Sequence, residues 1–308
     1  MERQLLIISI SLILIIGCQQ MGVVENYNKE KIVESIPINN ILQHENKIIT
    51  YEDIWEYILN NNQENKEAYI NEQILFYMNM HLKDVDKFEQ YLNDSYYFIY
   101  YVINELEKEK LPLELALIPY IESNYDPFSI SSSGAVGMWQ FMPKTGRLYE
   151  LNKTWWNEDR HDPYRSTEAA VDYLKYLYER FNQDVYLTLA AYNGGEGTLS
   201  KAIEKNKDAS KAIKFWDLQL PNETENYVPK FLALAHIIKN KDSLKIDLPS
   251  IPNQKVFEII EIRDQIEIST IVEVSDLDYE TFTKFNPGFR RSVTPPNKKF
   301  FHFFSSRS

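Results

Sequence analysis

The sequence predicts a mainly α-helical protein with a small α+β module at its C-terminal end. Between residues 51 and 245, apolar residues recur at the three- and four-residue spacing of helices, without strand–helix–strand alternation or a fixed repeat. At Leu248–Pro252 two prolines mark a change of pattern. After it, residues 256–262 alternate as a strand, 271–285 have helical spacing, and 300–304 form a second short strand.

Composition excludes several classes of protein. The chain has 308 residues, of which 44% are hydrophobic and 25% charged, so it can bury a sizeable core and is not disordered throughout. Its net charge of −12 argues against a nucleic-acid binder, because phosphate binding requires clustered Lys and Arg. Residues 19–110 hold 17 acidic and 8 basic residues, so most of the negative charge belongs to the N-terminal region. A single cysteine excludes an internal disulfide.

That cysteine, Cys18, ends the most hydrophobic stretch of the chain. The apolar run Leu5–Ile16 would span only about 18 Å as a helix, too short to cross a membrane but typical of an export signal. The sequence Ile15-Ile16-Gly17-Cys18 resembles a bacterial lipobox, which implies cleavage before Cys18 and a lipid on its sulfur. An ordinary signal peptide or an uncleaved anchor is the alternative. We expect a lipoprotein signal peptide over 1–17 and a polar tether over 18–50.

The helical part divides into an N-terminal helical region, 51–110, and a helical domain, 111–245. A linker, 246–254, leads to the module at 255–308. Leu113–Ser123 is apolar at nearly every position, which predicts a buried helix. The other helix signals are N-caps at Thr167, Asp184 and Thr224, and a stop at Asn193–Gly195 for the helix after Asp184.

Glu122 is out of place in this apolar helix. A carboxylate near the C-terminal end of a buried helix has its charged form disfavoured, which raises its pKa toward the range that a general acid needs. Pro127 follows, and then a loop rich in Ser and Gly, 129–137, that allows close approach to a ligand. Trp139–Pro143 adds an aromatic face and an amide. A solvated or ion-paired glutamate is the alternative.

Four motifs occur in order in this part of the chain: Glu122-Ser123, GAVGMWQFMP at 134–143, AAYNGG at 190–195 and ENYVPK at 225–230. They resemble the catalytic motifs of lytic transglycosylases of the goose-type lysozyme-like superfamily, and especially the membrane-bound lytic murein transglycosylase D branch. The resemblance covers about residues 65–245. It implies a lysozyme-like all-helical catalytic domain at 111–245.

The resemblance also implies cleavage of peptidoglycan between N-acetylmuramic acid and N-acetylglucosamine, with closure of a 1,6-anhydro ring. Glu122 would be the sole general acid and base, because the sugar's own C6 hydroxyl replaces the second carboxylate of ordinary glycosidases. Asp126 and Glu196 are alternative catalytic carboxylates. A lysozyme-type hydrolase and a catalytically lapsed peptidoglycan-binding lipoprotein are the alternative functions.

The resemblance implies six substrate-binding residues: Ser131, Gln140, Met142, Tyr192, Asn193 and Tyr227. For the aromatic ones, including Tyr227, core packing is the alternative. Three tryptophans, Trp155, Trp156 and Trp216, are predicted to be core residues. His161 has no His or Cys partner at metal-ligand spacing, so we expect no metal and no cofactor.

Residues 265–288 resemble a diverged LysM repeat, a βααβ fold that binds N-acetylglucosamine chains. This implies that the module binds glycan, and the alternative is a module that only packs on the catalytic domain. The expected partners are peptidoglycan and a membrane through lipid on Cys18, with no nucleic acid, and the expected state is a monomer. Gln19 after the cysteine favours the outer membrane, facing the periplasm, over the inner one.

Overall fold

The computed structural model describes residues 51–61, 70–206, 213–262, 264–275, 277–296 and 300–305. The predicted signal peptide, Cys18 and the tether at 18–50 lie outside the described residues. Among the described residues, no helix is both long and apolar enough to cross a membrane.

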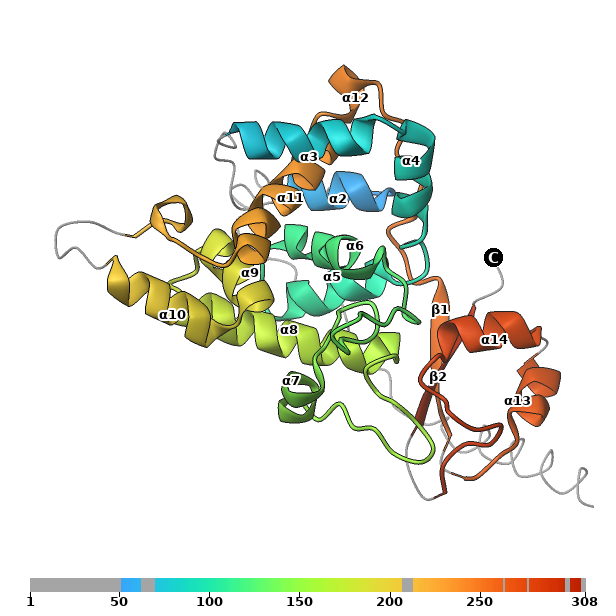
Figure 1. Ribbon diagram of the computed structural model, residues 1–308. Helices are drawn as coiled ribbons and strands as arrows, with labels where there is room; N and C mark the ends of the chain where they lie inside the picture. The colour runs from blue at the N-terminus through green and yellow to red at the C-terminus, as the bar shows by residue number, and fades with distance from the viewer. Residues whose placement is uncertain are drawn as a thin grey trace, which may run out of the picture. The chain divides into compact units, whose positions relative to one another are not determined.

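Helices make up most of the described chain, which confirms the mainly α-helical prediction (Figure 1). Their bounds, in chain order, are α2 Ile54–Asn60, α3 Glu72–Leu82, α4 Val85–Asn93, α5 Ile99–Lys108, the 3₁₀ helix η1 Leu113–Leu117, α6 Ile118–Ser123, α7 Pro143–Leu148, α8 Pro163–Arg180, α9 Val185–Gly194, α10 Glu196–Lys205, the 3₁₀ helix η2 Phe215–Asp217, α11 Asn222–Lys239, α12 Lys241–Leu244, α13 Ile268–Ser275 and α14 Tyr279–Phe285.

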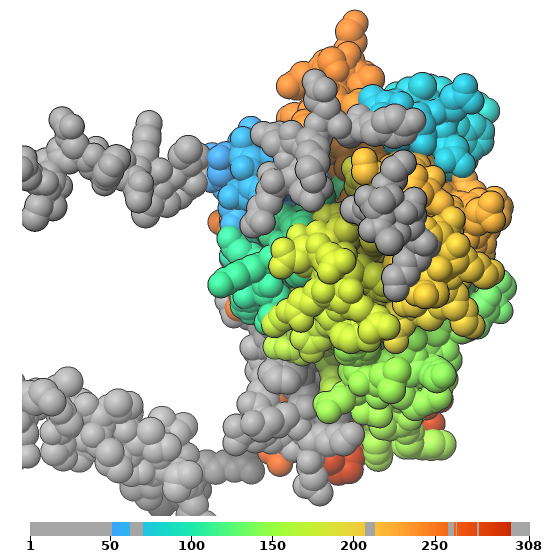
Figure 2. All heavy atoms as spheres, turned by 90° about the vertical axis from the view of Figure 1, so that its left-hand side faces the viewer, coloured from blue at the N-terminus to red at the C-terminus, as the bar shows by residue number. Residues whose placement is uncertain are grey.

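One hydrophobic core unites the helices on both sides of the boundary predicted at 110/111. It runs from Ile54 of α2 through η1 and α6 to α11, and it also includes Phe257 and Phe285 of the C-terminal module. Helix α11 packs against α3 and α9, and α5 packs against α8 and η1. Seen from the side, the segments of α8 to α11, yellow-green to gold, gather on one face, with cyan α3 above them (Figure 2). The predicted domain boundaries stay predictions.

The C-terminal module is built on a two-stranded antiparallel sheet. Strand β1, Phe257–Ile262, pairs with β2, Phe300–Ser305, so that Phe257 lies opposite Ser305. The helices α13 and α14 come between the strands in sequence, and they pack through a small cluster of Ile268, Ile271 and Phe282. The predicted strand–helix–strand pattern is therefore present, with two helices where one helical segment was predicted. The likeness to a LysM repeat stays a prediction.

Two of the three predicted N-caps are wrong. Helix α8 begins at Pro163, and its cap is Asp162, whose Oδ1 accepts hydrogen bonds from the backbone N–H groups of Tyr164 (2.9 Å) and Arg165 (3.0 Å). A proline suits the first helical position because it has no N–H to leave unpaired. Helix α11 likewise begins at Asn222, before Thr224. Asp184 is confirmed as a cap, since it accepts a hydrogen bond from Leu187 N–H.

Candidate active site

Glu122 lies in the last turn of α6. The single helix predicted for Leu113–Ser123 is instead a 3₁₀ turn, η1, that runs directly into the six-residue α6. The change occurs next to Pro119, which lacks an N–H and stands in the first turn of α6. The helix ends at Asn124, whose φ of 56° is left-handed. Tyr125 then ties the chain back, because its hydroxyl is buried and donates to the Ala116 carbonyl at 2.7 Å.

The half-buried carboxylate of Glu122 accepts a 2.6 Å hydrogen bond at Oε1 from the hydroxyl of Tyr227. Burial raises the pKa of Glu122 to about 7, with a further increase from the charge of Glu223. The hydrogen bond from Tyr227 and the charge of Lys230 act in the opposite direction. With a pKa in this range, both protonation states of Glu122 are accessible near neutral pH, so Glu122 can either donate or accept a proton.

The three residues that affect the pKa of Glu122 come from one face of α11. Glu223, Tyr227 and Lys230 are four and three residues apart, the spacing that places side chains above one another on a helix. Sequence reasoning predicted a role for Tyr227 but none for Glu223 or Lys230. The helical spacing from Tyr227 is the signal that could have indicated both.

The end of α9 contributes Tyr192 and Asn193. The Tyr192 hydroxyl donates to the Trp139 carbonyl at 2.8 Å. Burial raises the pKa of Tyr192 well above its ordinary value, and the charge of Glu122 adds to this increase. A role of Tyr192 in orienting the carboxyl or the N-acetyl group of the substrate stays a prediction. Asn193 Oδ1 accepts a 2.9 Å hydrogen bond from Thr224 Oγ1, which links the end of α9 to α11.

Three predicted substrate-binding residues lie on the loop between α6 and α7. Ser131 Oγ accepts a hydrogen bond from Ala135 N–H at 2.9 Å, and Gln140 Nε2 donates to the Gly137 carbonyl at 2.7 Å. Both side chains therefore shape the loop itself. Met142 is 42% exposed and is available for contact. Their contact with a glycan stays a prediction.

The alternative catalytic carboxylates have local partners. Asp126 Oδ1 accepts a hydrogen bond from Phe128 N–H at 2.9 Å, as in a turn. Glu196 Oε2 accepts a 2.6 Å hydrogen bond from the Tyr176 hydroxyl and lies 3.3 Å from Arg180 Nε. Neither carboxylate contributes to the pKa shift of Glu122.

Two of the tryptophans that were predicted to be core residues differ in burial. Trp155 is 66% exposed, so its prediction as a core residue is wrong, and its ring lies 3.7 Å from the guanidinium of Arg291. Trp216 is partly buried and packs against the core.

His161 Nδ1 lies 2.7 Å from the Pro127 carbonyl. Within the described part of the chain, no group of three or more His, Cys, Asp or Glu side chains is arranged to hold a metal ion.

Two cavities adjoin the end of α6, and Asn124 lines both. One, of about 910 Å³, is lined mainly by Ser123–Phe128 and by residues along α14. The other, of about 620 Å³, lies among α3, α4, α6 and α11 and includes Lys230. Glu122 lines neither of them.

Comparison with known proteins places this site in a family context. Residues 100–215 match the family described as the Transglycosylase SLT domain. Membrane-bound lytic murein transglycosylase D of Escherichia coli (strain K12) is 36% identical over 196 residues, which are 64% of this chain and 43% of that protein. The Putative tributyltin chloride resistance protein of Alteromonas sp. (strain M-1) is 32% identical over 165 residues, 54% of this chain and 78% of that protein.

Among solved structures, the 70 kDa soluble lytic transglycosylase SLT70 from Escherichia coli aligns with a TM-score of 0.40 and 19% identity, over 60% of this chain and 29% of that chain. The present chain spans less than half the length of its relative from strain K12. The family match contains Glu122, the loop and Tyr192, whereas Tyr227 lies beyond its end at residue 215.

Proposed function

The chain belongs to the SLT-domain family of transglycosylases, and from that premise we propose that it is a lytic transglycosylase of the bacterial cell wall. It would cleave the bond between N-acetylmuramic acid and N-acetylglucosamine in peptidoglycan and leave a 1,6-anhydromuramoyl end. The observation that carries this proposal is the contact between Glu122 and Tyr227, together with the pKa of about 7 at Glu122.

The reaction needs a proton donor first and a proton acceptor second. Protonated Glu122 donates its proton to the glycosidic oxygen as the bond to the sugar breaks. The resulting carboxylate then takes the proton of the C6 hydroxyl, whose oxygen closes the anhydro ring on the same sugar. A pKa near neutrality suits both steps, since neither form of Glu122 is strongly disfavoured.

Tyr227 stabilises the deprotonated form of Glu122. Its hydroxyl points at Oε1 and hydrogen-bonds the carboxylate that remains after the proton has left. The hydroxyl of Tyr192 is held by the Trp139 carbonyl, and burial together with the charge of Glu122 raises the pKa of Tyr192.

A single acid/base residue fits the arrangement of carboxylates. Ordinary glycosidases use a pair, about 5–5.5 Å apart in retaining enzymes and farther apart in inverting ones. Asp126 and Glu196 are engaged in local contacts. Glu223 is exposed and is the remaining carboxylate whose charge affects Glu122. An intramolecular nucleophile makes a second catalytic carboxylate unnecessary, which favours the transglycosylase over a hydrolase.

Mass spectrometry of digested sacculi tests the proposal. A transglycosylase releases fragments with anhydro ends, which are lighter by one water than the reducing ends that a hydrolase leaves. We expect anhydro ends. Reducing ends would establish the lysozyme-type hydrolase, and a zymogram without clearing would establish the lapsed, binding-only lipoprotein.

We further propose that the protein acts in the cell envelope, as the word "membrane-bound" in the name of its relative suggests. Lipid on Cys18 would hold the enzyme beside its insoluble substrate, as a monomer on the outer membrane facing the periplasm. Labelled palmitate should enter the wild-type protein but not a Cys18→Ser variant. Equal labelling of the two would contradict the anchor.

A further inference from the structure

The C-terminal module joins the catalytic part through backbone hydrogen bonds. Glu158 N–H donates to the Gly288 carbonyl at 2.8 Å, and Arg290 N–H donates to the Trp156 carbonyl at 2.8 Å. Asn157 and Phe289 form an antiparallel bridge between these two bonds. Residues 288–290 therefore pair with residues 156–158 in the manner of a short strand.

The pairing is close because Gly288 has no side chain. A Cβ at this position would lie 3.3 Å from the Asp162 Cβ, tighter than most such contacts, and 3.4 Å from the Glu158 carbonyl oxygen, at the limit of ordinary van der Waals contact. Aromatic contacts strengthen the attachment elsewhere: the Phe285 ring packs edge-on against Tyr97, with centroids 4.9 Å apart. The module is thus fixed at two places, on residues 156–158 and on Tyr97 of the N-terminal helical region.

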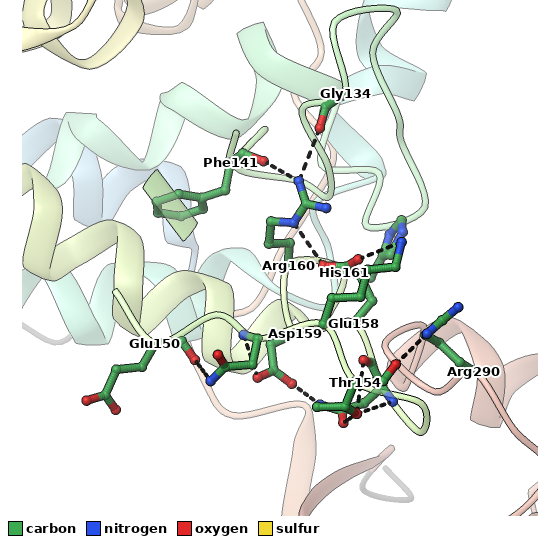
Figure 3. Close-up of polar contacts among 12 residues, drawn as sticks. Gly134, Phe141, Glu150, Thr154, Glu158, Asp159, Arg160, His161 and Arg290 are labelled. Carbon is green, nitrogen blue, oxygen red and sulfur yellow. Dashed lines mark hydrogen bonds and ion pairs between the residues drawn. The ribbon is translucent and has the colours of Figure 1, made fainter. Parts of the chain in front are cut away.

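Arg160 lies two residues after the paired segment 156–158, and its side chain contacts the loop formed by residues 134–141. Its buried guanidinium bonds Glu158 Oε1 through Nε at 2.8 Å. Its Nη1 donates to the carbonyls of Phe141 at 2.9 Å and Gly134 at 3.1 Å, so one side chain holds both ends of residues 134–141 (Figure 3). The loop also lies directly against the Arg160 backbone, because a Cβ on Gly137 would fall 1.9 Å from the Arg160 carbonyl oxygen.

The same loop contacts Ser123, which follows Glu122 in the chain, and Tyr192 at the end of α9. The Met138 carbonyl accepts a 2.9 Å hydrogen bond from Ser123 Oγ, and the Trp139 carbonyl accepts one from the Tyr192 hydroxyl. A displacement of residues 134–141 would therefore move the groups that surround the catalytic carboxyl. A continuous series of contacts therefore runs from Gly288 to Ser123, the residue next to Glu122.

We propose that the C-terminal module braces the active site: its pairing with residues 156–158 fixes Glu158 and Arg160, and Arg160 is a positioning residue that fixes the loop 134–141. Charge-assisted hydrogen bonds to two carbonyls are strong enough to hold a glycine-containing loop in one conformation. The catalytic consequence rests on the proposed function, whereas the mechanical link does not.

Hydrogen–deuterium exchange on the full chain tests the link without requiring activity. Gly288→Val forces the paired segments apart and should raise exchange at residues 134–142 about tenfold or more, since the braced hydrogen bonds open more often. Gly288→Ala should produce a smaller increase in the same peptide. Val274→Ser is the matched control in the module, because Val274 is 82% exposed, and it should leave the loop unchanged.

Variants of Arg160 test the positioning role. Arg160→Gln should raise loop exchange as Gly288→Val does, and Arg160→Lys should rescue part of the effect, because a lysine keeps the charge opposite Glu158 without the fork that reaches two carbonyls. Exchange in the core of α8 should stay at the wild-type level. Unchanged exchange at 134–142 in Gly288→Val, or an equal rise throughout the chain, would overturn the brace.

Activity gives a separate readout. If the proposed function holds, kcat of Gly288→Val should fall about tenfold, in parallel with loop exchange. A wild-type protein without activity on peptidoglycan would contradict the proposed function. In that case, faster exchange at residues 134–142 in Gly288→Val than in the wild type would still establish the brace. Wild-type kcat in a variant whose loop has loosened would overturn the link to catalysis.

Discussion

The hydroxyl of Tyr227 hydrogen-bonds the carboxylate of Glu122 at 2.6 Å across 105 residues of sequence. This contact joins the end of the short helix α6 to the first turns of α11 and defines the chemistry of the site. Burial favours the protonated form of Glu122, and the tyrosine favours the carboxylate. The balance of the two leaves the pKa near neutrality.

Removing the tyrosine hydroxyl should disturb that balance in a known direction. In Tyr227→Phe the contribution that lowers the pKa of Glu122 is lost, so the alkaline limb of kcat/KM should move to higher pH. The rate at the optimum should fall about ten- to hundredfold, as expected for a hydrogen bond to a charged group. The pH dependence of peptidoglycan cleavage measures both effects.

Tyr192→Phe is the comparison for this variant. Its hydroxyl bonds the Trp139 carbonyl and not Glu122, so the alkaline limb should not follow that of Tyr227→Phe. An alkaline limb at wild-type pH in Tyr227→Phe would show that Tyr227 does not tune the carboxyl.

The raised pKa of Glu122 also predicts a pH-dependent cost in stability. An unfolded glutamate has a pKa of about 4.3, below the folded value of about 7. Folding therefore loses free energy as pH rises from about 4.3 to 7, and the cost is constant above that range. The neutral Glu122→Gln avoids it and should be about 1–3 kcal/mol more stable than the wild type at pH 8, with little difference below about pH 4.5.

Urea unfolding at the two pH values measures this difference. The variant keeps an oxygen that can accept the Tyr227 hydrogen bond, so the comparison isolates the charge. If the free energies of unfolding of the two proteins differed by the same amount at both pH values, this would contradict a raised pKa at Glu122.

Glu223 separates the one-carboxylate mechanism from a two-carboxylate one. Its charge raises the pKa of Glu122, so Glu223→Gln should move the alkaline limb to lower pH and keep the maximal rate within about tenfold of the wild type. Lys230→Gln should move the limb in the opposite direction. A loss of about a thousandfold or more in Glu223→Gln would make it a second catalytic residue.

The contact between α9 and α11 predicts a stability difference between two glycines. A Cβ on Gly194 would lie 2.5 Å from Thr224 Oγ1, so Gly194→Ala should displace the hydroxyl that holds Asn193 and cost about 2 kcal/mol or more. Gly197→Ala in α10 has open space and should be neutral or stabilise by about 0.5 kcal/mol. Equal unfolding midpoints for the two variants would contradict this contact.

The sequence identified what is local and missed what depends on the tertiary structure. Glu122 is recognisable because a carboxylate interrupts an apolar run. The stop at Asn193–Gly195 is recognisable because glycine readily adopts the positive φ that ends a helix, and Gly195 has a φ of 82°. The contact with Tyr227 spans 105 residues, so no local pattern predicts it, and only the family resemblance indicated that residue.

Arg160 was missed for a different reason. The segment 157–162 reads as a polar loop, and nothing in its composition indicates that Glu158, Asp159 and Arg160 are buried. Their burial depends on the loop and on the C-terminal module that cover them, which lie far away in the sequence. A helix signal can fail for a related reason: Thr167 and Thr224 have the chemistry of caps, but prolines nearby set the start of their helices earlier.

The most direct test of the account is the yield of anhydro-ended fragments released from purified sacculi by the wild type and by Glu122→Gln. Circular dichroism should first show that both proteins are folded alike. We predict that the variant releases at least about a thousandfold fewer anhydro ends than the wild type, because it can neither donate nor accept the proton. Release at the wild-type level by the folded variant would contradict the assignment of Glu122 as the acid and base.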